Sequence, residues 1–152
     1  MGDIAENLKR VKDRIQQAAI RAGRDPGEIG LVAVSKEKPA WMIKEAVEAG
    51  HRVFGENYAQ ELIAKDKEIE GGVVWHFVGS LQRNKVKYIV DKVDMIHSLD
   101  RISLAEEIQR RAKKAVKVLL EINLAGEESK AGASEEDAFK LLEGIKKLDK
   151  IE

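Results

Sequence analysis

The sequence predicts an α/β fold of the (β/α)8 TIM-type barrel class, with about the first five β/α units preceded by an N-terminal helix. Three observations lead to this prediction. Short apolar runs alternate with amphipathic segments, the runs recur at a near-constant interval, and no glycine fingerprint follows the first run. Strands that alternate with helices are typical of βαβ units, whose parallel sheet is buried on both faces.

The N-terminal segment, residues 3–22, is predicted to be an amphipathic helix. Apolar side chains recur there at steps of three and four, at Ile4, Leu8, Val11, Ile15 and Ala19. Asp3 and Glu6 resemble a capping box, and Gly23 stands where a left-handed cap belongs.

Five β-branched runs then alternate with five helical patterns. The predicted strands span 30–36, 52–56, 73–79, 95–99 and 117–123, and the predicted helices span 39–49, 57–68, 83–90, 101–115 and 134–148. The strands end near positions 36, 57, 79, 99 and 123, at intervals of 21, 22, 20 and 24 residues. One strand and one helix per interval favours a barrel over a Rossmann sheet.

A dinucleotide-binding fold loses its main support at the first strand end, because Ser35-Lys36-Glu37-Lys38-Pro39 occupies the place of the glycine fingerprint. A complete barrel has about 250 residues. This chain stops at Lys150-Ile151-Glu152, about where a sixth strand should begin. Residues 1–152 are therefore interpreted as a single α/β barrel domain without its C-terminal units, which leaves an open sheet edge.

Composition excludes several classes of protein. Lys plus Arg and Asp plus Glu both total 27 in the 152 residues, which argues against a nucleic-acid binder. No cysteine is present, so disulfides and thiolate metal sites are excluded and a cytoplasmic location is expected. The charged N-terminus is neither a signal peptide nor a membrane span.

Lys36 is the sharpest candidate among the polar residues at the strand ends, where barrels place their function. Alternation puts Val32, Val34 and Lys36 on one face of the first strand. If that face points inward, partial desolvation favours the neutral amine that Schiff-base chemistry requires. The alternative is a lysine that extends from the strand end into water.

Other strand-end residues allow two interpretations each. Asn57 could bond a cofactor hydroxyl or cap the next helix. His76 could flank a planar ring or be a satisfied core histidine, and the three histidines show no metal-ligand spacing. The small and basic residues from Gly79 to Lys85 suit an anion or form an ordinary helix start.

Several segments together resemble the pyridoxal phosphate homeostasis protein family, whose fold resembles the N-terminal barrel of alanine racemase. They occur in the family's order over nearly the whole chain: Leu31-Val32-Ala33-Val34-Ser35-Lys36, Phe54-Gly55-Glu56-Asn57-Tyr58, Trp75-His76-Phe77-Val78-Gly79-Ser80-Leu81-Gln82, His97-Ser98-Leu99-Asp100, Asn123-Leu124 and Ser129-Lys130-Ala131-Gly132.

The resemblance implies that Lys36 holds pyridoxal 5′-phosphate as a Schiff base. It also implies a cofactor pocket lined by Asn57, His76, Phe77 and Gly79, with Ser98 and Asn123 close by. Family members are regarded as cofactor carriers or regulators of vitamin B6 balance, with PLP-dependent apoenzymes as partners. Without the second domain that gives alanine racemase its opposing tyrosine, efficient catalysis is not expected.

Two other functions remain open from the residues alone. A Schiff-base lysine in a barrel also serves amino-acid racemases and class I aldolases, and a barrel fragment could be an interaction module without cofactor. The family's C-terminal phosphate loop has no counterpart in these 152 residues. We therefore expect weak cofactor binding by this chain, and self-association through its open barrel edge.

Overall fold

A computed structural model describes residues 2–70, 72–127 and 131–152 of the chain. Every predicted strand and helix is found, with ends shifted by a few residues. The strands are β1 (Ala33–Val34), β2 (Val53–Glu56), β3 (Val74–Phe77), β4 (Val93–Leu99) and β5 (Lys117–Leu120). The helices are α1 (Asp3–Arg21), η1 (Pro26–Glu28, a 3₁₀ turn), α2 (Ala40–Glu48), α3 (Ala59–Glu68), α4 (Arg83–Ile89), α5 (Ile102–Arg111) and α6 (Glu135–Ile145).

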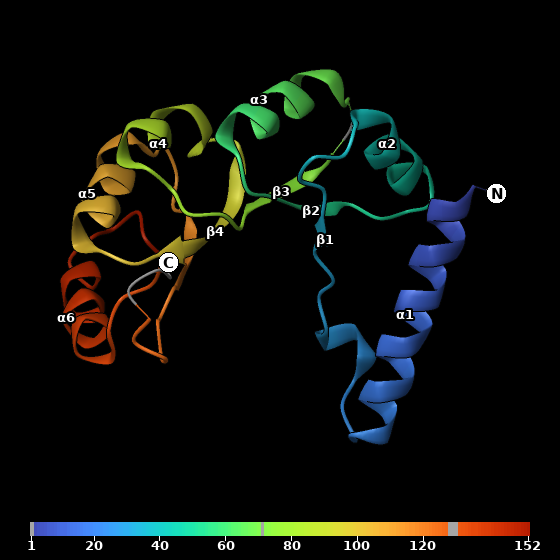
Figure 1. The fold of residues 1–152 in the computed structure, drawn as a ribbon, viewed down its shortest axis with the longest axis horizontal. Helices are drawn as coiled ribbons and strands as arrows, with labels where there is room; N and C mark the ends of the chain where they lie inside the picture. Colours follow the sequence, from blue (N-terminus) through green and yellow to red (C-terminus); the bar gives the residue numbers. More distant parts are fainter. Residues whose placement is uncertain (1, 71, 128–130) are drawn as a thin grey trace.

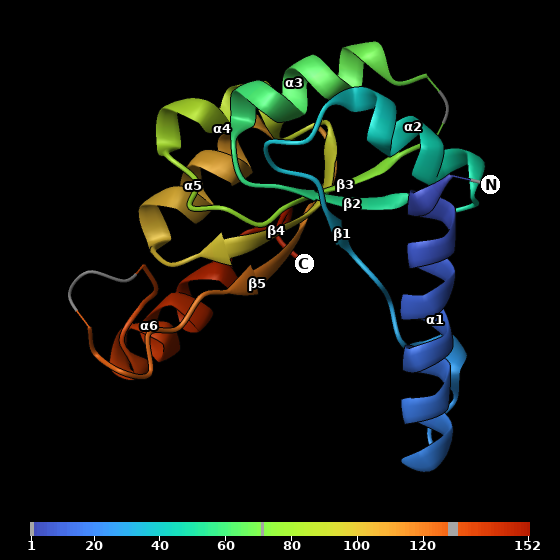
Figure 2. The ribbon, with the colours of Figure 1, turned by 45° about the vertical axis from the view of Figure 1, so that its right-hand side comes forward.

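The five strands form one sheet in the order β1-β2-β3-β4-β5, and all neighbours are parallel. Each strand therefore lies beside the next one in the chain. This order confirms the barrel-type prediction, because a Rossmann sheet reverses its strand order part-way. In Figures 1 and 2 the helices α2, α3, α4 and α5 follow one another along the outer, convex side of the curved sheet.

The core lies between the sheet and these helices. Strand side chains that face the helices are almost fully buried, and they include Phe54, Trp75, Phe77 and Ile96. Leu62, Val86 and Leu104 meet them from α3, α4 and α5. Burial of each large apolar side chain contributes roughly 1.5–3 kcal/mol, so this layer fixes the sheet that carries the strand ends.

Helix α1 lies at the β1 end of the sheet beside α2 and η1 (Figure 1). The predicted capping box is wrong: Gly2 is the N-cap residue and no side chain caps the helix, because Asp3 already belongs to its first turn. The predicted left-handed cap is confirmed, since Gly23 has a φ of 67°.

The last residues of the chain pair with β5. Ile151 forms a parallel bridge with Val116, and the Glu152 amide donates a hydrogen bond of 3.0 Å to the Val116 carbonyl. This isolated bridge lies where the sequence predicts a sixth strand to begin, and the sixth strand itself stays a prediction. Ser129 and Lys130, which carry part of the family resemblance, lie outside the described residues. Within the described part of the chain, no helix has the length and apolar character needed to cross a membrane.

Candidate functional site

Lys36 lies in the turn that directly follows β1. The preceding residue, Ser35, is buried and donates its hydroxyl to Glu56 beneath α3, whereas Val34 lies on the opposite, concave side of the sheet. Lys36 itself is exposed. The prediction that Lys36 lies in a partly desolvated pocket is therefore wrong for the described residues. The neighbouring Val34, on the concave side, is likewise 53% exposed, because no element of the described residues packs against it.

Gly55 gives the concave side next to Lys36 a flat apolar surface. A Cβ atom added there would lie 3.2–3.3 Å from methyl groups of Val32, Val34 and Val78. These contacts confirm that Val32 and Val34 share one face of β1, as predicted. A flat apolar surface beside a primary amine is chemically suited to a planar aromatic ring that carries an aldehyde.

Asn57 and Gly79 lie against each other at the carboxyl ends of β2 and β3. A Cβ atom on Gly79 would be 2.4 Å from the Asn57 carbonyl oxygen, so only glycine permits this approach. Asn57 is half-buried and is not the N-cap of α3, because Tyr58 holds that position. The alternative role of Asn57 as a helix cap is therefore wrong.

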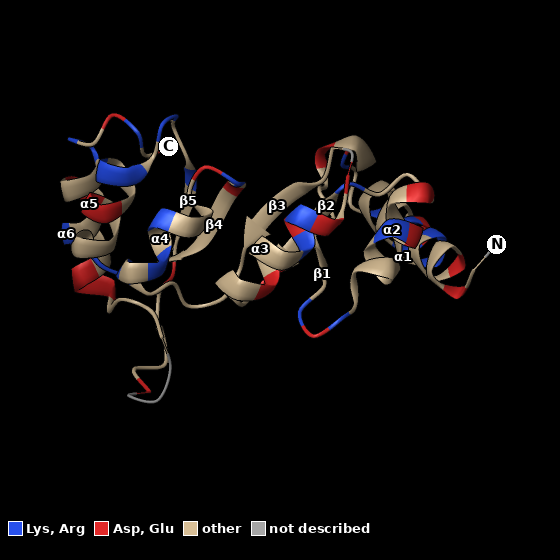
Figure 3. Cartoon of the chain, turned by 90° about the horizontal axis from the view of Figure 1, so that it is seen from above, with Lys and Arg blue, Asp and Glu red and all other residues tan. Residues whose placement is uncertain are grey.

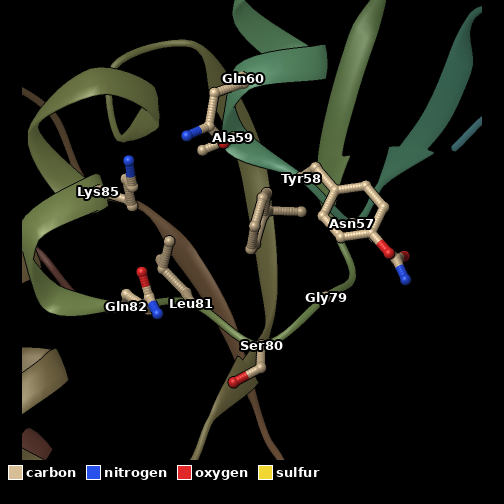
Figure 4. A pocket seen from close by; sticks show the side chains of 10 residues that line it. Asn57, Tyr58, Ala59, Gln60, Gly79, Ser80, Leu81, Gln82 and Lys85 are labelled. Carbon is tan, nitrogen blue, oxygen red and sulfur yellow. The ribbon is translucent and has the colours of Figure 1, made fainter. Parts of the chain in front are cut away.

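A pocket of about 380 Å³ opens at these two strand ends (Figure 4). Its lining comes from the β2–α3 and β3–α4 connections and from both helix starts: Asn57, Tyr58, Ala59, Gln60, Phe77, Gly79, Ser80, Leu81, Gln82 and Lys85. Gln60, Gln82 and Lys85 border the hollow, whereas the Asn57 amide points away from it (Figure 4). The prediction that residues 79–85 suit an anion stays a prediction.

His76 and His97 form a contact pair on adjacent strands. Nδ1 of His76 lies 3.0 Å from Nε2 of His97. Burial lowers the pKa of both imidazoles, and the neighbouring His97 lowers that of His76 further. Both rings are therefore favoured as neutral groups, one donating a hydrogen bond to the other. In the described part of the chain, no cluster of three or more His, Asp or Glu side chains could hold a metal ion.

The remaining predicted site residues lie in three different surroundings. Phe77 is 2% exposed in the core under the helices and also lines the pocket at the β2 and β3 ends. Ser98 is buried, and its Oγ has no hydrogen-bond partner among the described residues. Asn123 donates its amide to the Glu127 carbonyl at 2.8 Å. The structure thus brings Asn57, Phe77 and Gly79 to one pocket, and the cofactor contacts of all predicted residues stay predictions.

Sequence reasoning missed an ion cluster under the Lys36 turn, formed by Glu56, Glu61 and Lys65. Two signals were present in the sequence. Glu56 is an acidic residue at the end of the second strand, and Glu61 and Lys65 have the spacing of an i,i+4 helix pair. Acidic and basic residues are interspersed over the other helices too (Figure 3), so the sequence alone does not distinguish the Glu61–Lys65 pair from a solvated pair.

Comparison with known proteins identifies the family. The family model "Alanine racemase, N-terminal domain" matches residues 2–152. The pyridoxal phosphate homeostasis protein of Pseudomonas aeruginosa is 42% identical over 155 residues, covering 99% of this chain and 67% of that protein. The chain belongs to the pyridoxal phosphate homeostasis protein family.

Solved structures agree with membership in the pyridoxal phosphate homeostasis protein family. PipY of Synechococcus elongatus, with PLP bound, is 36% identical with a TM-score of 0.81, and the match covers 99% of this chain and 67% of PipY. Alanine racemase from Corynebacterium glutamicum shares the fold alone, with a TM-score of 0.71 at 15% identity over 98% of this chain and 40% of the racemase. The chain thus spans about two thirds of the length of its family relatives.

Proposed function

We propose that this chain is part of a single-domain barrel that binds pyridoxal 5′-phosphate through Lys36 and takes part in cellular PLP homeostasis. The observation that carries the proposal is the likeness to PipY, a structure with PLP bound that matches 99% of this chain at 36% identity. Lys36 in this chain has chemistry that suits that ligand, because it presents a primary amine just after the parallel strand β1.

The residues around Lys36 fit such a group. Pyridoxal 5′-phosphate supplies an aldehyde that forms a carbon–nitrogen double bond to a primary amine with loss of one water. The apolar surface at Val34, Gly55 and Val78 would take the ring face, and its exposure at Val34 leaves room for it. Asn57 and His76 would bond polar groups at the ring edge. The hydroxyl of Ser98, which has no hydrogen-bond partner among the described residues, would be a further donor.

We assign this function to a carrier and not to a racemase or aldolase. A carrier requires only reversible attachment at Lys36, and its partners would be PLP-dependent apoenzymes in the cytoplasm. An assay of alanine racemisation with added cofactor checks this assignment. Turnover that depends on Lys36 would contradict the carrier and favour the racemase.

Attachment to Lys36 is tested by trapping. We expect the protein with excess cofactor to gain a visible absorbance band, and to lose it when borohydride reduces the carbon–nitrogen bond. Peptide mass spectrometry should then find the added mass on the peptide that contains Lys36. Lys36→Met should abolish that labelled peptide.

Lys44→Met is the matched control, because Lys44 is an exposed lysine that pairs with Glu68 on the helical side. It should leave labelling at Lys36 unchanged. Cofactor spread evenly over the surface lysines, or no band at all, would refute the proposal.

A further inference from the structure

A charged cluster is buried between the sheet and α3, next to the turn that carries Lys36. Lys65 is 6% exposed and Glu56 is fully buried. The Lys65 ammonium lies 2.7 Å from a carboxylate oxygen of Glu56 and 2.7 Å from one of Glu61. Lysine is almost never this buried unless it is paired, so the cluster requires an explanation.

The cluster holds the backbone on both sides of Lys36. Lys65 donates to the Ser35 carbonyl at 2.7 Å, and the Ser35 hydroxyl donates to Glu56 at 2.7 Å. On the other side of Lys36, the Glu37 amide donates to Glu61 at 2.8 Å. All three bonds involve an ionised group, and such bonds are stronger than those between neutral groups.

The turn itself is a strained one. Glu37 has a φ of 59°, and it is the one residue other than glycine with a positive φ in the described ranges. The left-handed region is unfavourable for a residue with a side chain, so the surrounding contacts must hold it. Glu61 supplies such a contact directly at the strained residue.

Two members of the cluster, Lys65 and Glu61, are favoured in their charged forms. Burial lowers the pKa of Lys65, but its hydrogen bonds to Glu56 and Glu61 outweigh burial and raise that pKa overall. The hydrogen bond from Lys65 lowers the pKa of Glu61. Both shifts therefore favour the charge states in which Lys65 and Glu61 hold the turn.

We propose that Glu61 and Lys65 are positioning residues, which clamp residues 35–37 to α3 and thereby aim the Lys36 amine over the concave surface at Val34 and Gly55. This positioning role presupposes the proposed function, in which Lys36 binds the cofactor. Neither side chain contacts the cofactor in this proposal. They act by reducing the number of backbone conformations open to residues 35–37, so that the Lys36 amine occupies fewer positions.

The first test needs no cofactor. Glu61→Ala removes the acceptor of the Glu37 amide, and we expect hydrogen exchange of the peptide spanning residues 35–38 to rise roughly tenfold or more. Glu61→Gln keeps an oxygen that can accept this bond and should restore most of the protection. Glu68→Ala, on the same helix in an exposed pair with Lys44, is the matched control and should leave the exchange unchanged.

The second test uses cofactor trapping at a temperature well below the thermal unfolding midpoint of each variant. In Glu61→Ala and Lys65→Met, the share of trapped cofactor found on Lys36 should fall relative to other lysines, which a loss of global stability alone would not cause. Lys65→Met leaves the buried Glu56 carboxylate without its cation, so this variant can fail to fold. In that case Glu61→Ala, at a side chain 29% exposed, decides the result.

The proposal is overturned if Glu61→Ala folds and leaves both the exchange of residues 35–38 and the share on Lys36 unchanged, or if Glu68→Ala changes them equally. Absence of trapping in the unsubstituted chain would refute the function of Lys36 instead. The exchange measurement would still decide whether the clamp exists.

Discussion

At the scale of single residues, the carboxyl ends of β2 and β3 approach each other closely enough to restrict which residues can stand there. Gly79 is the clearest case, because an added methyl group would meet backbone atoms of Asn57 at 2.4–2.9 Å. Backbone cannot rotate away as a side-chain tip can. The closeness of β2 and β3 at this point, and with it the pocket beside them, depends on the missing side chain.

Gly79→Ala should therefore lower the free energy of unfolding by about 1–3 kcal/mol, the usual cost of overpacking a close contact. Urea unfolding followed by circular dichroism measures this change. Gly30→Ala is the control, since nothing lies within 4 Å of a Cβ atom there, and it should change stability by no more than about 0.5 kcal/mol. Equal losses in both variants would rule out the steric explanation.

At the scale of elements, helix starts are stabilised in different ways. Helix α1 begins without a side-chain cap, whereas Ser134 caps α6 by accepting a hydrogen bond of 3.1 Å from the Asp137 amide. Three acidic residues in the first turn of α6 add a favourable interaction with the helix dipole. Helix α6 thus has a start fixed by local sequence, while α1 depends on its apolar stripe.

Ser134→Ala should lower the free energy of unfolding by about 1 kcal/mol, because the Asp137 amide loses its acceptor. Thermal and urea unfolding both report this loss. Ser80→Ala removes an exposed hydroxyl outside any helix and should have little effect. A loss at Ser134 no larger than at Ser80 would show that the cap is dispensable.

At the scale of the whole molecule, the three histidines all make the stability of the fold depend on pH in the same direction. Burial is the largest cause that lowers the pKa of His51, His76 and His97. The unfolded chain then binds protons at a higher pH than the folded chain does. Stability must fall as the pH drops below the ordinary histidine value of about 6.5, and continue to fall until the folded chain is protonated too.

We therefore expect the urea midpoint to decrease between about pH 7.5 and pH 5.5, before the carboxylates titrate. Replacing His76 and His97 together by Asn should make the midpoint less dependent on pH in this interval. Arg101→Gln, which changes a charge pair with Asp100, is the control and should keep the dependence. A midpoint that stays constant, or rises on acidification, would contradict the lowered histidine pKa values.

The order of strands and helices could be predicted from the sequence better than the surroundings of individual side chains. The period of one strand and one helix is a property of the chain alone, so the parallel order of β1 to β5 could be predicted from it. The cluster of Glu56, Glu61 and Lys65 could not be predicted from the sequence, because burial of Lys65 depends on how α3 packs. The exposure of Lys36 was likewise not predictable from β1, since it depends on what covers the concave side. The register shift in β4 between Ile96 and Leu99 left no recognisable signal either.

The strand order of the sheet has a consequence for folding. Because β1 to β5 are neighbours in the same order as in the chain, each β/α unit makes its strand contacts with the units directly before and after it. Loops that must close are therefore short, and their entropic cost is small. Such a chain can acquire structure progressively during synthesis, with each completed unit serving as the template on which the next strand docks.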